Sequence, residues 1–167
     1  RFPITVEQEY PSIKIETNEK NVDIVSFLTK RKIMVASHIG VTPQDYKDFS
    51  KIRAVGRTEK ERNNLIDLAL KLEDAGSILL FLECIVKDVA KEITSLVNIP
   101  TIGIGSSIYC DWQVLVINDL LGFESNFIKP KFVKSYTNLS SIIKKSVRKY
   151  SKEVKKRKFP NNKYTYK

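Results

Sequence analysis

The stretch Leu79-Leu80-Phe81-Leu82-Glu83-Cys84 decides the fold class of this chain. It is a continuous apolar run, long enough for one strand and too short for a typical helix, and it ends at a carboxylate. Such a strand is typical of a parallel sheet that is covered on both faces. A carboxylate at its end is costly to bury unless it faces a cleft, a metal or a titrating partner. Glu83 is therefore the first candidate for chemistry, and the alternative is a Glu that only caps a solvated loop.

Short apolar runs and amphipathic helical patterns alternate along the rest of the chain. We expect strands at residues 12–16, 33–38, 79–84, 101–105 and 131–136, a polar loop at 42–57, and helices at 19–31, 87–97, 112–121 and 137–158. One further helix should start at Thr58, which fits a capping box with Glu61, and end at Gly76. This alternation predicts a parallel α/β sheet with right-handed crossovers. No linker divides the chain, so we expect a single domain over residues 1–167, with a basic C-terminal helix and tail.

Positive charge is concentrated at the C-terminal end of the chain. Residues 128–167 hold 14 Lys and Arg and a single acidic residue, Glu153, whereas the other 127 residues hold 15 basic and 18 acidic side chains. A lysine-rich segment can bind nucleic acid or anionic lipid. The aromatic residues of this segment are scattered and show no recognition-module spacing, so we expect a solvated basic face and no nucleic-acid partner.

The composition limits the cellular location that we expect and the kinds of metal site that the chain can form. No apolar run reaches the roughly 18 residues of a membrane span, so we expect no membrane partner and a cytoplasmic location. Cys84 and Cys110 are too few for a disulfide framework or a zinc cluster and suit reduced thiols. The single histidine excludes a His-rich metal site. Because the sequence starts at Arg1, we expect a processed or truncated product.

Polar side chains fall at or near the C-terminal ends of successive predicted strands. Lys14 and Glu16 lie on the first strand, His38 on the second and Glu83 on the third, and residues 105–107 follow the fourth. In a parallel sheet these ends share one edge, where (β/α)₈ barrels and open α/β sheets hold their active sites. Two plainer interpretations remain open: Lys14 and Glu16 form a simple ion pair, and His38 is a buried histidine satisfied by backbone.

Short motifs in a fixed order extend this pattern over nearly the whole chain. They are Lys14-Ile15-Glu16, His38-Ile39-Gly40-Val41-Thr42-Pro43-Gln44, Gly56-Arg57, Leu82-Glu83-Cys84, Ile99-Pro100-Thr101-Ile102-Gly103-Ile104-Gly105, Asp111, Gln113-Val114-Leu115-Val116, Asp119-Leu120-Leu121-Gly122, Lys131-Phe132-Val133-Lys134-Ser135-Tyr136 and Phe159-Pro160. Any one motif is weak, but their order and spacing are specific. Together they make the chain resemble the C-terminal part of the ketopantoate hydroxymethyltransferase (3-methyl-2-oxobutanoate hydroxymethyltransferase) family.

The resemblance implies a (β/α)₈ TIM barrel, of which this chain supplies about the fourth to eighth strands. It implies transfer of a hydroxymethyl group from 5,10-methylenetetrahydrofolate to 3-methyl-2-oxobutanoate, giving 2-dehydropantoate for pantothenate and coenzyme A synthesis. By position in the family's motifs, Glu83 is the proton acceptor, Lys14 and His38 belong to the substrate pocket, and Glu16 is a ligand of Mg²⁺. The same resemblance implies a keto acid and a folate as small-molecule partners, and a homo-oligomer.

The chain also departs from the family pattern. The Asp–Ser pair and the further Asp of the family's first three strands, which hold magnesium and substrate, have no counterpart in this chain. Thr17, Asn18, Ser37, Ser107 and Trp112 stand where the family usually has glycine, and Ser106 stands where it usually has alanine. These replacements suggest a relaxed site, because glycine lets the backbone approach a ligand closely.

Two alternatives to an active transferase stay open. One is an inactive remnant that serves only as an interaction or assembly module, and the other is a related TIM-barrel C–C lyase. A barrel that lacks three strands has open sheet edges and an uncovered interior. We therefore expect that the chain self-associates, folds poorly alone or belongs to a longer product.

Overall fold

The computed structural model describes residues 12–42, 53–123 and 129–166 of the 167-residue chain. The chain divides into two compact units, Arg1–Val114 and Leu115–Lys167, and each is described by itself. The single domain expected over residues 1–167 stays a prediction beside this division. Most of the predicted loop at residues 42–57 lies outside the described residues.

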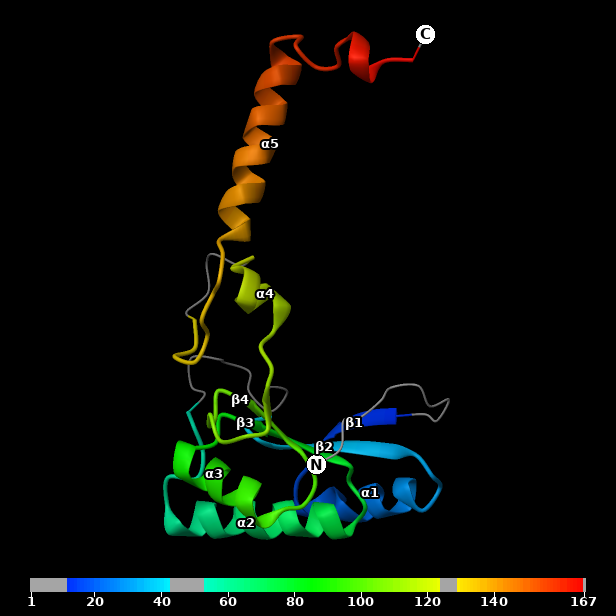
Figure 1. Ribbon diagram of the computed structural model, residues 1–167, viewed down its shortest axis with the longest axis vertical. Coiled ribbons are helices and arrows are strands. Elements are labelled where there is room, and N and C mark those ends of the chain that lie inside the picture. The colour runs from blue at the N-terminus through cyan, green and yellow to red at the C-terminus, as the bar shows by residue number, and fades with distance from the viewer. Residues whose placement is uncertain (1–11, 43–52, 124–128, 167) are drawn as a thin grey trace. The chain divides into compact units, whose positions relative to one another are not determined.

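The first unit is built on a parallel sheet of five strands, whose spatial order β1-β2-β3-β4-β5 follows the chain (Figure 1). The strands are β1 (Ser12–Glu16), β2 (Met34–Gly40), β3 (Leu79–Glu83), β4 (Thr101–Ile104) and β5 (Trp112–Gln113). The connections between the first four strands hold η1 (Glu19–Asn21), α1 (Val22–Thr29), α2 (Glu59–Asp74) and α3 (Lys87–Leu96). The predicted α/β class is confirmed, and parallel strands in chain order form a section of a (β/α)₈ barrel.

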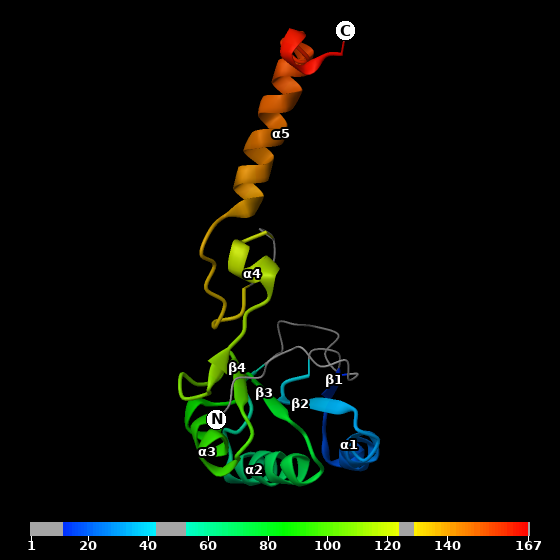
Figure 2. The same cartoon turned by 45° about the vertical axis from the view of Figure 1, so that its right-hand side comes forward.

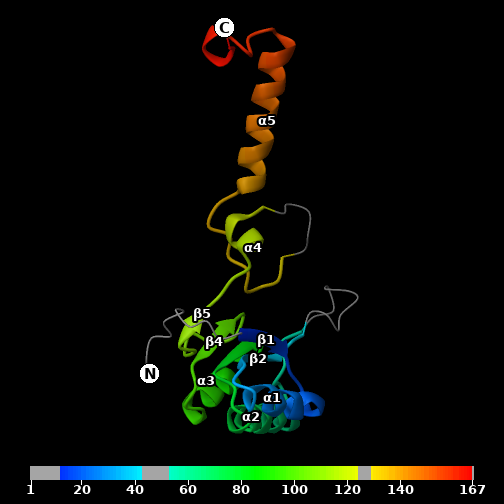
Figure 3. The ribbon, with the colours of Figure 1, turned by 90° about the vertical axis from the view of Figure 1, so that its right-hand side faces the viewer.

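All three α-helices of this unit lie on one side of the sheet, as Figure 2 and Figure 3 show. Alternate residues of β2 and β3 point toward them, because successive side chains of a strand leave opposite faces. Apolar side chains from both layers form one buried core, which includes Val25, Val35, Ile39, Leu68, Leu72, Leu80, Leu82, Val89 and Ile93. The intervening residues of β2 and β3, among them His38 and Glu83, belong to the opposite face of the sheet.

The start of α2 follows from its first residues. The Thr58 hydroxyl accepts a hydrogen bond from the Glu61 N–H at 3.2 Å, as the sequence predicts. The Glu61 carboxylate also accepts from the Arg57 and Gly56 N–H groups at 2.8 and 3.0 Å. The bond from Arg57 contributes most to lowering the pKa of Glu61. Gly76, with φ 93°, follows the helix, where a left-handed residue ends it.

The predicted helix at residues 112–121 is wrong over its first part. Residues 112–113 form β5, and a helix, α4, covers only Ile117–Leu121. The Asp111 carboxylate accepts from the Thr101 N–H and hydroxyl at 2.8 and 3.1 Å, which holds the chain beside β4. A Cβ on Gly103 would lie 2.9 Å from the Gln113 side-chain oxygen, so glycine there leaves room for β5.

The predicted strand at residues 131–136 is also wrong, because this stretch forms turns and irregular structure. The Val133 N–H donates to the Pro130 carbonyl at 3.0 Å, which closes a turn. The Tyr136 N–H donates to the Leu120 carbonyl at 2.8 Å. This stretch therefore bonds locally to α4, and the fifth strand lies at β5 instead.

The second unit contains α4, α5 (Leu139–Lys155) and η4 (Asn162–Tyr164). Asn138 caps α5 by accepting from the Ser141 N–H at 2.9 Å. This helix confirms the terminal helix predicted at residues 137–158, with ends two or three residues shorter. No residue of α5 is buried, and its large apolar side chains are exposed: Ile142, Ile143, Val147, Tyr150 and Val154.

Candidate functional site

The structure brings together all four side chains that the sequence singled out. Lys14 and Glu16 lie on β1, His38 on β2, and Glu83 at the end of β3. The parallel register sets Glu16 beside His38, and Glu83 beside Gly40 two residues further along β2. These residues lie near the carboxyl ends of neighbouring parallel strands, so the predicted edge of the sheet is the candidate site.

His38 is the centre of this cluster. Its Nδ1 lies 3.0 Å from Lys14 Nζ and 4.0 Å from Glu16 Oε1, and its Nε2 lies 3.1 Å from Glu83 Oε2. The His38 side chain is 3% exposed, against 15% for Glu83 and 26% for Glu16. The alternative of a histidine satisfied by backbone is wrong, because both ring nitrogens contact charged side chains. The amino group of Lys14 likewise contacts the imidazole, which a simple Lys14–Glu16 pair does not describe.

The contact with Lys14 decides which tautomer His38 adopts. A lysine ammonium group can only donate, so Nδ1 accepts and the ring proton sits on Nε2. This nitrogen faces Glu83, but its N–H is not aligned for a hydrogen bond and has no other partner among the described residues. A buried donor without a partner costs about 1–3 kcal/mol. A Glu83 oxygen lies 3.1 Å away, where rotation of its carboxyl group would let it accept this proton.

The aromatic ring of Phe81 lies beside the cluster. Lys14 Nζ lies 5.2 Å from the centroid of the Phe81 ring, and the His38 ring meets Phe81 edge-on at 6.4 Å and 70°. A cation over an aromatic face is attracted by the ring's quadrupole. Sequence reasoning missed Phe81, although its place two residues before Glu83 puts both side chains on one face of β3. It gives the charged cluster one apolar wall.

The backbone that carries Glu83 is closely confined. Gly40, with φ 105°, faces it from β2, and a Cβ there would lie 2.2 Å from the Glu83 carbonyl oxygen. The Val41 N–H donates to this oxygen at 2.9 Å. The position after Glu83 is Cys84, a non-glycine residue with φ 51°. A residue in the left-handed region directly after a strand changes the direction of the chain. Here the change comes immediately after the candidate base.

The thiol of Cys84 is poorly suited to act as a nucleophile. Burial and, second, the nearby Glu83 carboxylate raise its pKa to about 11. A thiol with so high a pKa is protonated near neutral pH and is a poor nucleophile. Cys84 and Cys110 are both free and buried, as the sequence predicts for reduced thiols.

The described residues do not form a complete metal site. Across residues 12–42, 53–123 and 129–166, no group of three His, Cys, Asp or Glu side chains could hold a metal ion. Mg²⁺ takes six oxygen ligands in near-octahedral geometry and keeps several waters. Glu16 offers one carboxylate beside the cluster, so these residues alone do not fit the ion.

Two of the residues that were expected to relax the site, Thr17 and Ser37, are held by hydrogen bonds. The Thr17 hydroxyl and N–H both donate to the His38 carbonyl, at 2.9 and 2.8 Å. The Ser37 hydroxyl shares a 2.6 Å hydrogen bond with the buried Ser77. These side chains use the room that a glycine would leave, and they add bonds behind His38. The expectation of a relaxed edge is therefore wrong at these positions.

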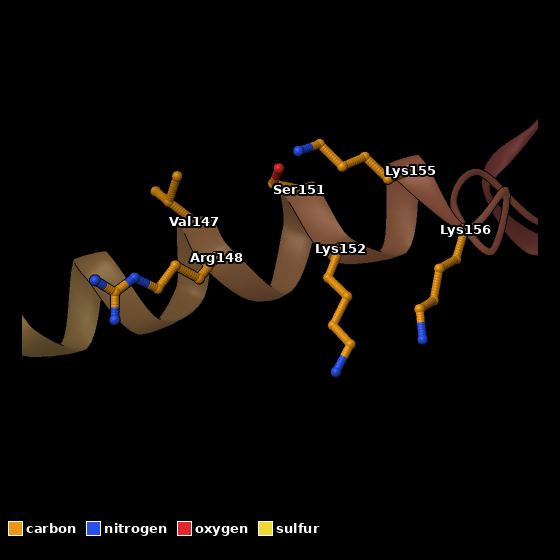
Figure 4. A pocket seen from close by; sticks show the side chains of 6 residues that line it. All are labelled: Val147, Arg148, Ser151, Lys152, Lys155 and Lys156. Atoms are coloured by element: carbon orange, nitrogen blue, oxygen red, sulfur yellow. The ribbon is translucent and has the colours of Figure 1, made fainter.

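A separate hollow of about 450 Å³ lies on the surface of the second unit. It is lined by α5 and the residue after it: Val147, Arg148, Ser151, Lys152, Lys155 and Lys156 (Figure 4). These side chains project outward from a single helix, and no second element closes over them. The hollow contains none of the predicted site residues and is a surface feature of a basic helix.

Comparison with known proteins matches nearly the whole chain to one family. Residues 3–162 match the sequence profile described as ketopantoate hydroxymethyltransferase. The chain belongs to this family. Its relatives include the 3-methyl-2-oxobutanoate hydroxymethyltransferase of Thermotoga maritima, 44% identical over 155 residues. The enzyme of the same name from Saccharolobus islandicus is 45% identical over 153 residues.

These matches cover 93% and 92% of the chain but 57% of each relative. The chain thus spans little more than half the length of the curated relatives it matches. The predicted ketopantoate hydroxymethyltransferase family and its TIM-barrel class are confirmed, with the five parallel strands as part of such a barrel. Within the described residues, no helix is long and apolar enough to cross a membrane.

Proposed function

We propose that this chain carries the deprotonation half of a hydroxymethyl-transfer site. The reaction moves a hydroxymethyl group from 5,10-methylenetetrahydrofolate to 3-methyl-2-oxobutanoate and gives 2-dehydropantoate, for pantothenate synthesis. One observation carries the proposal: His38 lies between Lys14 at 3.0 Å and Glu83 at 3.1 Å, on the sheet edge where such barrels bind substrates. The names of the relatives agree with this chemistry.

Glu83 is the proton acceptor of the proposed reaction. A Glu83 oxygen takes the proton from the carbon next to the ketone, and the electron pair of the broken C–H bond moves into an enolate. The side chain is 15% exposed, so it is open to a substrate while its backbone is held by neighbouring strands. Positioned general bases of this kind contribute about 10²- to 10⁴-fold to a rate.

Lys14 and His38 prepare the site for that step. The ammonium group of Lys14, on β1, offers a positive charge to the carboxylate or the developing enolate oxygen of the keto acid. His38 accepts from Lys14, and its Nε2 lies 3.1 Å from Glu83, so the ring lies between the two groups. Lys14 thus lies where it can meet the negative charge of the substrate, and His38 lies beside the carboxyl group of the proposed base.

The proposed cofactor is Mg²⁺, with Glu16 as one ligand. Its remaining ligands would come from the keto acid and from water, because one carboxylate rarely holds this ion. Such an ion would polarise the keto acid and lower the free energy of its enolate. A titration of the chain with Mg²⁺, with and without 3-methyl-2-oxobutanoate, tests this part alone.

Deuterium exchange tests the proposed function directly. The full chain is incubated with 3-methyl-2-oxobutanoate and Mg²⁺ in D₂O, and loss of the substrate's C–H signal is followed by NMR. Glu83→Gln should abolish the exchange, whereas Glu59→Gln, an exposed carboxylate in the first turn of α2, should leave it unchanged. Exchange that persists in Glu83→Gln refutes the assignment of the base. Addition of 5,10-methylenetetrahydrofolate then tests the complete transfer.

Self-association is the second part of the proposal, and α5 supports it. Five of its apolar side chains are 40–58% exposed, and a helix with one apolar stripe is stabilised by a partner. Light scattering of the full chain measures the assembly directly, and a monomer at high micromolar concentration contradicts it.

No contact at the described site favours a carbon–carbon lyase or an inactive remnant. The cytoplasmic location stays a prediction.

A further inference from the structure

Ser106 connects two backbone groups that flank the candidate base. Its hydroxyl donates to the Leu82 carbonyl at 2.6 Å and accepts from the Ile85 N–H at 3.1 Å. Leu82 precedes Glu83, and Ile85 follows Cys84, so one side chain closes the turn on both sides. Ser106 comes from the loop after β4 and reaches this turn across the sheet.

The turn needs this connection because regular strand pairing stops at Glu83. Cys84 adopts φ 51°, a conformation that residues with a side chain rarely adopt. Leu82 and Ile85 are 0% and 1% exposed, so water cannot easily satisfy their backbone groups. Without the Ser106 hydroxyl, the Ile85 N–H would lose its side-chain acceptor at a buried position. The backbone groups of the turn could then form other hydrogen bonds.

The other backbone groups of this turn are already bonded to neighbouring elements. The Cys84 N–H donates to the Ile104 carbonyl at 2.9 Å, and the Val55 N–H donates to the Cys84 carbonyl at 2.9 Å. The Glu83 carbonyl accepts from Val41 at 2.9 Å. Ser106 therefore supplies the acceptor for the Ile85 N–H, and it adds a side-chain donor to the Leu82 carbonyl, which belongs to the ladder between β3 and β4. Its hydroxyl completes the fixation of the segment that carries Glu83.

We propose that Ser106 is a positioning residue for Glu83, which it holds at the 3.1 Å contact with His38. This inference rests on the proposed function, in which Glu83 takes the proton. Small displacements of a catalytic group cost large factors in rate, because the reacting atoms must be aligned.

The test combines an activity readout with a spectroscopic one on the full chain. Ser106→Ala should slow the deuterium exchange of 3-methyl-2-oxobutanoate about tenfold at saturation, with the half-saturating concentration unchanged. It should also move the ¹³C signal of the Glu83 carboxyl group, which is identified by its loss in Glu83→Gln. Ser106→Thr, which keeps the hydroxyl, should restore both values.

Ser107→Ala is the matched control, because the Ser107 hydroxyl accepts from the Tyr109 N–H instead. Wild-type exchange and an unmoved Glu83 signal in Ser106→Ala overturn the proposal. If Ser106→Ala does not fold, Ser106→Cys carries the same test with a side chain of similar size. A wild-type chain without exchange refutes the proposed function, whereas the Glu83 signal still decides whether Ser106 positions it.

Discussion

Replacing Gly40 by alanine tests the closest backbone approach at the site. The added Cβ would lie 2.2 Å from the Glu83 carbonyl oxygen and 2.9 Å from Ile85 Cγ1. The oxygen belongs to the backbone and already accepts from Val41, so it cannot move without disturbing β3. The conformation of Gly40, φ 105°, adds strain for any residue with a side chain.

Gly56 allows the steric contribution to be separated from the conformational strain. Like Gly40 it has a positive φ, but an added Cβ would not collide with a backbone atom. Its φ is 86°, and an added Cβ would find its nearest neighbour, Val86, at 3.3 Å. We expect Gly56→Ala to lower the free energy of unfolding by about 1 kcal/mol, for conformational strain. Gly40→Ala should lower it by about 3 kcal/mol, because displacement of packed backbone adds to the strain.

Urea denaturation followed by circular dichroism measures both values on the same scale. The expected difference of about 2 kcal/mol lies well outside the error of the method. Equal losses for the two variants would refute the steric argument, because the 2.2 Å approach would then have no energetic consequence. The deuterium exchange of Gly40→Ala should fall as well, since the displaced backbone carries Glu83.

Two further predictions concern the ends of β3 and α2. The pKa of Cys84 is about 11 in the folded chain and 9.0 for an ordinary thiol, so the unfolded chain loses this proton first. The thiol's stabilising contribution is therefore complete below pH 9.0 and is lost as the pH rises toward 11, by about 1.4 kcal/mol per pH unit. Urea midpoints across this range should fall more steeply in the wild type than in Cys84→Ala, and parallel curves contradict the assignment. Thr58→Ala removes the N-cap of α2 and should cost about 1 kcal/mol in thermal unfolding, with Thr58→Ser nearly unchanged.

Elements with strong local signals were predicted well. The strand expected at residues 79–84 is β3, Leu79–Glu83, because a buried apolar run leaves a chain few other ways to exclude water. The strand at 12–16 has the predicted bounds. The helix after Thr58 begins at Glu59, since its cap lies in the sequence itself.

The last strand could not be predicted because distant partners decide it. Two residues, Trp112 and Gln113, are too few to carry a periodic pattern. They form β5 because Asp111 binds Thr101 and because Gly103 leaves space on β4. Residues 131–136 show the opposite case, in which a stretch with several apolar and aromatic residues pairs with no strand of the described sheet.

The site was predicted in its members but not in its contacts. Lys14, Glu16, His38 and Glu83 could be placed on one edge from strand order alone. That His38 contacts both Lys14 and Glu83 depends on register and on side-chain reach, which no sequence pattern records. Ser106 was counted as a loosening replacement, because the turn that its hydroxyl bonds is visible only in three dimensions.

The order in which the strands pair has a consequence for folding. Ile102 and Trp112, on β4 and β5, are 10 residues apart in the chain, whereas Ala36 and Leu79, on β2 and β3, are 43 apart. Closing the longer loop costs about 1.3 kcal/mol more in chain entropy. We expect β4 and β5 to associate early and β2 to join β3 late. The pairing that brings His38 to Glu83 would then be among the last to form and the first to open, so the reactive edge would report the final step of folding.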